Sequence, residues 1–314
     1  MFTFLHYLML LAPMFGLAAF GFALARLPFW RPGWTRAISK FVFAVPLPAL
    51  LVHLMSGLSR LPPVDARLLI AFFGSCLLVF GSGRLLARLA FRLDGVGQSV
   101  FALGGVFSNN VLLGVPLAKL ALGPEALPSV ALVLVFNALT LWTLATVSVE
   151  WARHGSLNLA GIGQTLRGVL TNPIILAILC GTALGLSGIS LPSPVSQVLA
   201  ALSAIAGPLA LVVVGLGLSE YGVRQELAQG LTITALKLLV QPAVVWALAL
   251  ALDLPPIERH AVVLLGSLPV GVNVYLVATQ FETLRGAIAS SLVLSTALAA
   301  LSTPLVLALQ GVFG

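Results

Sequence analysis

Polar residues interrupt an apolar segment of the sequence, and their types suit the binding of an anion. Ser108, Asn109 and Asn110 are followed by Gly114 and Pro116. Amide side chains donate hydrogen bonds. Pro116 removes a backbone donor, and Gly114 permits close approach of another chain. A half-helix that starts here would aim its free N–H groups and the positive end of its dipole at a bound anion.

A second interruption, in a later apolar segment, carries related chemistry. It contains Pro269, Gly271 and Asn273, with Tyr275 two residues further on. Backbone that leaves the helix at membrane depth is tolerated where protein or a water-filled cavity satisfies it. We therefore expect the two breaks to meet and to line a small polar cavity, which suits a carboxylate on a modest apolar body. The predicted substrate-binding residues at the breaks are Ser108, Asn109, Asn110, Asn273 and Tyr275.

Lys237 lies well inside an apolar segment, about nine residues, or roughly 13 Å, from its expected cytoplasmic end. Ionisable residues inside a membrane are candidates for function. The alternative is that Lys237 extends to an interface or binds helix-end carbonyls. Gln241 follows at i+4 on the same helical face. We expect Lys237 or Gln241 to support the site electrostatically, and count both among the substrate-binding candidates.

The elements that must position these residues are membrane spans. The chain is 60% hydrophobic and 8% charged, whereas a soluble domain carries about 25% charge. The net charge of +7 is scattered between apolar runs, so it forms no patch for nucleic acid. A span needs about 20 apolar residues. Ten segments qualify: 5–25, 36–57, 68–90, 99–121, 127–150, 168–188, 195–218, 229–252, 260–280 and 286–309.

Basic residues predict the orientation. The loops after the odd-numbered spans, with their flanks, hold eleven: Arg26, Arg31, Arg36, Lys40, Arg84, Arg88, Arg92, Arg153, Arg167, Arg224 and Arg285. The opposite loops hold four: Arg60, Arg67, Lys119 and Arg259. By the positive-inside rule the odd-numbered loops are cytoplasmic, which places both termini outside.

The ten segments divide into two sets of five. We expect a first repeat at residues 1–150, a cytoplasmic connecting loop at 151–167 and a second repeat at 168–314. An odd number of spans per repeat forces inverted orientations. Breaks that recur in spans 2 and 7, and in spans 4 and 9, favour this arrangement over ten independent helices with unrelated prolines. The expected fold is thus an all-α integral membrane protein with broken crossover helices 4 and 9.

Other classes of function have little support in the sequence. All nine acids fall at span ends or in loops, and the four histidines are isolated from one another. An intramembrane enzyme would need a nucleophile with its base, or metal ligands, at membrane depth. We expect no enzyme, no metal and no cofactor. A channel remains an alternative, but a polar site at paired breaks fits alternating access better.

These motifs resemble those of a known family, the auxin efflux carriers and PIN-like transporters. The sequence Asn109-Asn110-Val-Leu-Leu-Gly114-Val-Pro116 resembles the family's fourth-span crossover, and Pro269-Val-Gly271-Val-Asn273 its ninth span. The start of span 6 (172–174), span 7 (207–218) and span 8 (237–242) also resemble the family. The short central loop resembles that of a bacterial member. In this chain Asn273 follows its proline, whereas Asn109 and Asn110 precede theirs.

The resemblance implies a secondary carrier of small organic anions, either dicarboxylates such as malonate and malate or auxin-like acids. It also implies elevator-type alternating access, with spans 1, 2, 6 and 7 as a scaffold and the remaining six as a moving part. A homodimer in the bacterial inner membrane is a further implication. The second hypothesis is a sodium-coupled carrier of the bile-acid transporter type, which would need cation-binding oxygens near the breaks.

Overall fold

The structure, a computed structural model, describes residues 2–57, 64–154, 173–189, 191–220 and 226–313. Apart from one isolated β-bridge, its regular elements are helices. The first half comprises α1 (Phe2–Ala25), α2 (Pro32–Ala44), α3 (Pro46–Ser56), α4 (Arg67–Phe91), α5 (Gly95–Val106), the π-helical turn η2 (Asn110–Gly114), α6 (Val115–Leu122), the 3-10 turn η3 (Pro124–Ala126) and α7 (Leu127–His154). The second half comprises α9 (Pro173–Ser187), α10 (Ser193–Leu218), α11 (Leu227–Ala235), the π-helical turn η4 (Leu236–Val240), α12 (Gln241–Ala251), α13 (Pro256–Ser267), α14 (Val272–Gln280) and α15 (Arg285–Phe313).

Seven helices within the described ranges are long and apolar enough to cross a membrane. Three further apolar helices are shorter: Gly95–Val106, Asn110–Leu122 and Leu176–Ser187. The segments expected at 99–121 and 260–280 are each present as two half-helices, α5 with η2–α6 and α13 with α14. The segment expected at 168–188 lies partly outside the described residues. The chain is therefore an all-α, multi-pass membrane protein.

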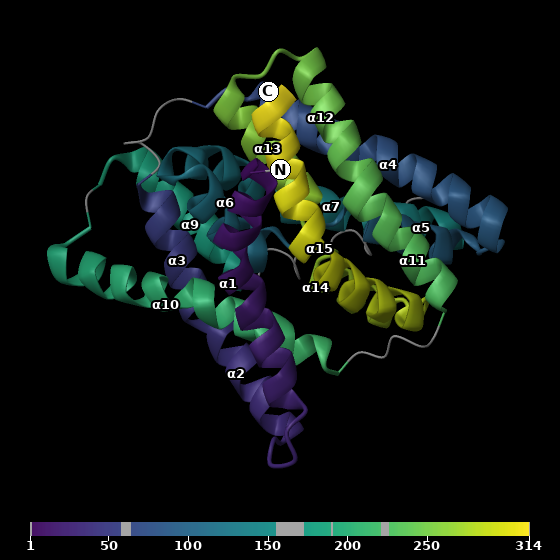
Figure 1. Ribbon diagram of the computed structural model, residues 1–314, viewed down its shortest axis with the longest axis horizontal. Helices are drawn as coiled ribbons and strands as arrows, with labels where there is room; N and C mark the ends of the chain where they lie inside the picture. Colours follow the sequence, from purple (N-terminus) through teal and green to yellow (C-terminus); the bar gives the residue numbers. More distant parts are fainter. Residues whose placement is uncertain (1, 58–63, 155–172, 190, 221–225, 314) are drawn as a thin grey trace.

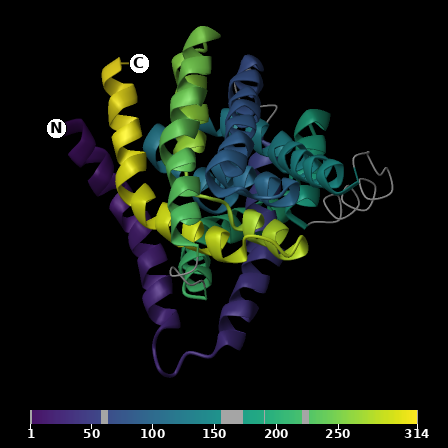
Figure 2. The ribbon, with the colours of Figure 1, turned by 90° about the vertical axis from the view of Figure 1, so that its right-hand side faces the viewer.

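The helices form two groups that pack mainly within themselves. One contains α1, α2, α3, α9 and α10, and the other contains α4, α5, α11, α12, α13 and α15. Figure 1 shows α3, α9 and α10 on one side, with α4, α5, α11 and α12 on the other. The packing of α1 on α15 and of α10 on η2 joins the groups. In Figure 2, α1 begins and α15 ends at the same end of the molecule, opposite the turn between α1 and α2.

Proline explains where two of the helices widen. Pro116 follows the π-helical turn η2, and Pro242 follows the π-helical turn η4. A proline has no N–H, and its ring clashes with the carbonyl of the residue four positions earlier. That residue is Leu112 in η2 and Leu238 in η4. Each helix accommodates its proline with one wider turn, a device that often marks functional sites.

Candidate functional site

The two interrupted segments meet through their backbones. Ser108 and Val270 form an antiparallel β-bridge. The N–H of Asn109 donates to the carbonyl oxygen of Pro269 at 3.0 Å, and the N–H of Gly271 donates to the carbonyl oxygen of Phe107 at 2.7 Å. Polar backbone groups freed by both breaks therefore satisfy one another, as burial at membrane depth requires.

A cavity of about 320 Å³ lies at this crossover, within the size range of small-molecule sites. Its polar lining consists of amides and a hydroxyl from both breaks and from α7. Its apolar lining comes from η2, α2, α7, α9 and α14. The polar side chains are Ser108, Asn109, Asn110, Asn137 and Asn273; the others include Phe43, Phe107, Leu134, Trp142, Ile178 and Leu276.

Asn137 on α7 was not among the residues expected from the sequence. Its Oδ1 accepts a hydrogen bond of 3.3 Å from Nδ2 of Asn110, and both residues are buried. An asparagine inside an apolar 28-residue helix was the available signal. In the part of the chain that the structure describes, Oδ1 of Asn110 and Oγ of Ser108 are buried without a hydrogen-bond partner. Buried polar atoms without a partner mark a site where a ligand or water can form the missing hydrogen bonds.

The electrostatics of the cavity come from the backbone, because none of the described residues that line it carries a charged side chain. The first residues of η2 (Asn110, Val111 and Leu112) and of α14 (Val272 and Asn273) contribute to its wall. The first N–H groups of a helix have no partner inside the helix. Each N-terminus carries about half a positive charge. Two such helix N-termini, together with the amide side chains, make a cavity that favours an anion although its described side chains are uncharged.

The other predicted residues lie around the cavity. Tyr275 is half-buried on α14 and does not line it. Gly114 is where η2 approaches the second break, since a Cβ there would be 2.9 Å from Leu265 and 3.0 Å from Leu268. Pro116 lines a separate cavity of about 310 Å³, with Lys119 and with Gly207 and Pro208 of α10.

Lys237 and Gln241 lie outside the cavity, in the helix group of α4, α12 and α13. Both side chains are fully buried. Nζ of Lys237 donates to the carbonyl oxygen of Gly266 at 2.5 Å. Nε2 of Gln241 donates to Oγ of Ser75 at 3.0 Å. Neither residue therefore reaches the cavity wall directly, and any effect of theirs on a ligand acts through the helices that form the crossover.

A second cavity adjoins the first on the side of the α1–α2 turn. It measures about 450 Å³ and shares Phe43, Leu112 and Val272 with the amide-lined cavity. Arg36 and Lys40, one turn apart on α2, line it and are exposed, as is Glu220 at the end of α10. No residue is shared with the cavity beside Pro116. Among the described residues, the amide-lined cavity therefore adjoins a basic vestibule on the side of α2.

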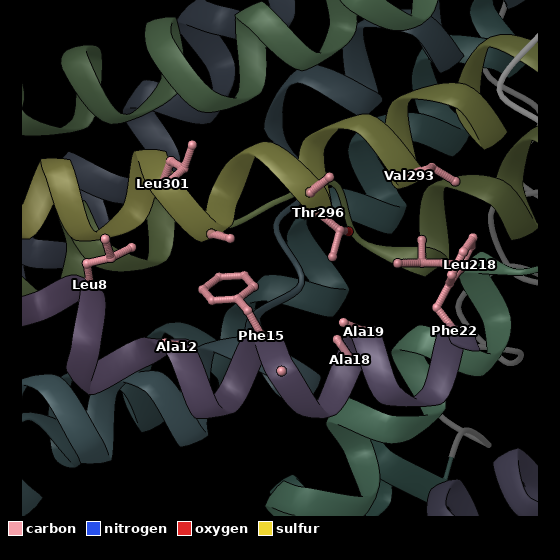
Figure 3. Close-up of a pocket in the computed structure, with 13 residues that line it drawn as sticks. Leu8, Ala12, Phe15, Ala18, Ala19, Phe22, Leu218, Val293, Thr296 and Leu301 are labelled. Atoms are coloured by element: carbon pink, nitrogen blue, oxygen red, sulfur yellow. The ribbon is translucent and has the colours of Figure 1, made fainter. Parts of the chain in front are cut away.

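A larger cavity, of about 530 Å³, lies between α1 and α15 (Figure 3). Leu8, Phe15, Phe22 and Leu301 contribute to its wall, and Thr296 contributes the one side-chain hydroxyl. Because this lining offers almost no hydrogen-bond donors, it does not suit an anion. The smaller crossover cavity is the candidate site.

Crossed, broken helices around a polar cavity define a membrane transporter, and sequence comparison agrees. Residues 158–307 match the family described as "Membrane transport protein". This match covers the second half of the chain, and it confirms the resemblance of the motifs to the auxin efflux carriers and PIN-like transporters. The chain is also 26% identical over 294 residues to a protein of Rhizobium meliloti (strain 1021) named "Putative malonate transporter", covering 92% of this chain and 91% of that protein.

Proposed function

We propose that the protein is a secondary active carrier of small organic anions, with dicarboxylates such as malonate or malate as the preferred class. One observation carries this proposal: the starts of two half-helices and four asparagines surround one cavity. A dicarboxylate has two negative ends, and the cavity has two positive helix ends. In this arrangement one carboxylate accepts N–H bonds at the start of η2 and the other at the start of α14. Asn109, Asn110 and Asn273 bind through their amides, with Asn137 beside them.

The name of the Rhizobium relative supports this substrate class. The motifs of the sequence are shared with auxin carriers, so auxin-like monocarboxylates are the second substrate class to test. A carrier is favoured over an enzyme because the described residues of the cavity wall supply amides, the Ser108 hydroxyl and apolar groups, and none of them pairs a nucleophile with a base.

The mechanism we propose is elevator-type alternating access by ten spans in two inverted repeats. The element spacing supports the repeat: α4 and α11 begin at Arg67 and Leu227, while α5 and α13 end at Val106 and Ser267, offsets of 160 and 161 residues (227 − 67 and 267 − 106). The group of α1, α2, α3, α9 and α10 is the proposed scaffold, and the other group carries the crossover. In this proposal the protein is a homodimer in the bacterial inner membrane with both termini outside, and the basic vestibule faces the cytoplasm.

The test is the current produced by purified protein on a solid-supported membrane. Malonate, malate, short monocarboxylates and indole-3-acetate are applied in turn, with and without a pH gradient. Asn109→Ala removes the amide, and Asn109→Asp keeps its shape but adds a negative charge. Gln197→Ala is the matched control, because Gln197 is an exposed amide on α10. We expect a saturable dicarboxylate current that both Asn109 variants abolish and the control retains. A full current in Asn109→Asp would contradict the proposed site.

A further inference from the structure

Lys237 is an ionisable side chain in an unusual place. It is 0% exposed, sits on η4 and donates to the carbonyl oxygen of Gly266. Among the described residues no carboxylate lies within ion-pair distance of its ammonium, since the ion pairs there join Arg67 to Asp65 and Arg285 to Glu282. A buried cation without a counter-ion is costly unless it meets oriented dipoles. The dipoles here are backbone carbonyls.

Those carbonyls belong to the end of α13, immediately before the second break. Gly266 is in the last turn of α13, which ends at Ser267. The final carbonyls of a helix have no partner within it and form the negative end of its dipole. Nζ of Lys237 binds one of them, and Oγ1 of Thr303 donates to the carbonyl oxygen of Ser267 at 3.3 Å. Side chains from η4 and α15 thus hold the end of α13 in place.

For α5, the corresponding half-helix of the first half, the hydrogen bonds of the described residues join no lysine or arginine side chain to its last carbonyls. α5 ends 161 residues before α13, and α4 begins 160 residues before α11, so the position that corresponds to Lys237 is Cys76 (237 − 161) or Leu77 (237 − 160). Cys76 is buried, and its Sγ accepts from Nε2 of Gln241 at 3.4 Å. Both of these positions in the first half carry an uncharged side chain. The charge is a feature of one half and is not required to build a half-helix of this kind.

We propose that the Lys237 ammonium is a built-in monovalent cation, held behind the crossover where a sodium ion would otherwise bind carbonyl and hydroxyl oxygens. It fixes the end of α13 permanently, so transport needs no sodium. It also offsets the negative end of α13, which leaves the positive starts of η2 and α14 to act on the anion. The effect on the anion rests on the proposed anion transport. The statement that the Lys237 ammonium takes the place of a sodium ion does not.

The first experiment measures thermal unfolding of purified protein in sodium chloride and in N-methyl-D-glucamine chloride, whose cation is too large to enter the core. Lys237→Ala leaves a space beside the carbonyl of Gly266, while Lys119→Ala removes an exposed lysine as the matched control. We expect sodium to raise the melting temperature of Lys237→Ala and to leave the wild type and Lys119→Ala unchanged. An equal response of all three proteins would overturn the proposal, whether or not the protein transports the anions tested.

The second experiment uses Lys237→Gln and Lys237→Arg in anion uptake by proteoliposomes. Glutamine keeps a donor for Gly266 but loses the charge, and arginine keeps the charge. We expect wild-type and arginine uptake to be independent of sodium. We expect glutamine uptake to fall by about tenfold or more, as the loss of a fixed buried charge predicts. Sodium-dependent wild-type uptake, or normal uptake by the glutamine variant, would show that the charge has no such role. If Lys237→Ala does not fold, this pair of variants decides the matter.

Discussion

The backbone N–H of Asn109 lies 3.0 Å from the carbonyl oxygen of Pro269, so the two breaks of the chain are joined directly. The reciprocal bond from Gly271 to Phe107 completes the joint. Since both bonds use backbone atoms, the side chains of Asn109 and Asn273 remain available to a ligand. Substitutions of these side chains should therefore alter binding while the crossover itself persists.

The pair of Asn110 and Asn137 provides the first prediction. Their amides are 3.3 Å apart in a buried setting, and hydrogen bonds between membrane helices contribute about 0.6 kcal/mol on average. Asn110→Ala and Asn137→Ala should each raise KM. The effect of the double variant should be smaller than the sum of the effects of the two single variants. A double-mutant cycle on KM for the transported dicarboxylate measures this coupling. Strict additivity would mean that the two amides act independently.

The second prediction concerns Gly271, where the second break lies close to the first. A Cβ at this position would be 3.0 Å from the carbonyl oxygen of Ser108 and 3.2 Å from Phe107. Gly271→Ala should push the breaks apart by a few tenths of an ångström and reduce transport by roughly severalfold, because small misplacements at a site already lower its rate. Gly16→Ala, where nothing lies within 4 Å, is the control. Transport and expression are compared in the same membranes, and an unchanged rate in Gly271→Ala would contradict the prediction.

A pair of glycines on α10 tests the packing of the proposed scaffold. A Cβ at Gly215 would collide with the backbone of Ala18 and Phe22 on α1, whereas Gly217 has nothing within 4 Å. Gly215→Ala should destabilise the protein by about 1–3 kcal/mol through overpacking. Gly217→Ala should be neutral or stabilising by up to about 1 kcal/mol, since alanine is the better helix former. Melting temperatures of the two variants decide this, and similar values would show that α1 and α10 do not pack tightly at Gly215.

The loop before α4 should make the stability of the protein depend on pH. Hydrogen bonds from Arg67 lower the pKa of the Asp65 carboxyl, and Arg67 also donates to the carbonyl oxygen of Leu252. A lowered folded-state pKa adds stability above the unfolded value, and that stability disappears as pH falls through the folded value. The melting temperature of Asp65→Asn should therefore be lower than that of the wild type near neutral pH, and the two should converge in acid. Because the pair is exposed, the difference should be small; a difference that grows in acid would reverse the assigned sign.

Much of the fold could be predicted because membrane burial leaves few solutions for the backbone. The polar residues from Ser108 to Asn110 and the Pro269–Asn273 motif located both breaks, since such groups need partners at membrane depth. Composition and span length indicated the helices. The pairing of specific backbone atoms across the joint, such as Asn109 with Pro269, depends on three-dimensional register, which no local pattern encodes.

The composition of the site was less accessible to sequence reasoning. Asn137 lies in an apolar helix and becomes part of the cavity only because α7 packs beside the first break. The depth of Lys237 was evident from the sequence, but the direction of its side chain was not. The π-helical turn η4 contributes to that direction, and it follows from Pro242 acting on the preceding turn.

The basic vestibule provides the last prediction. Arg36 and Lys40 line a cavity that shares three residues with the amide-lined site. Their charges should concentrate anions at one face of the membrane, and the effect should weaken as salt screens it. A double Arg36→Gln, Lys40→Gln variant should raise KM about two- to tenfold for substrate presented on the vestibule side, as expected for exposed charges. The maximal rate, and KM from the opposite side, should not change. Arg31→Gln, an exposed residue just before α2 that does not line the vestibule, is the control. Uptake is measured at low and high salt in vesicles in which the orientation of the protein is known. An equal rise in KM from both sides would rule out a vestibule that acts at one face.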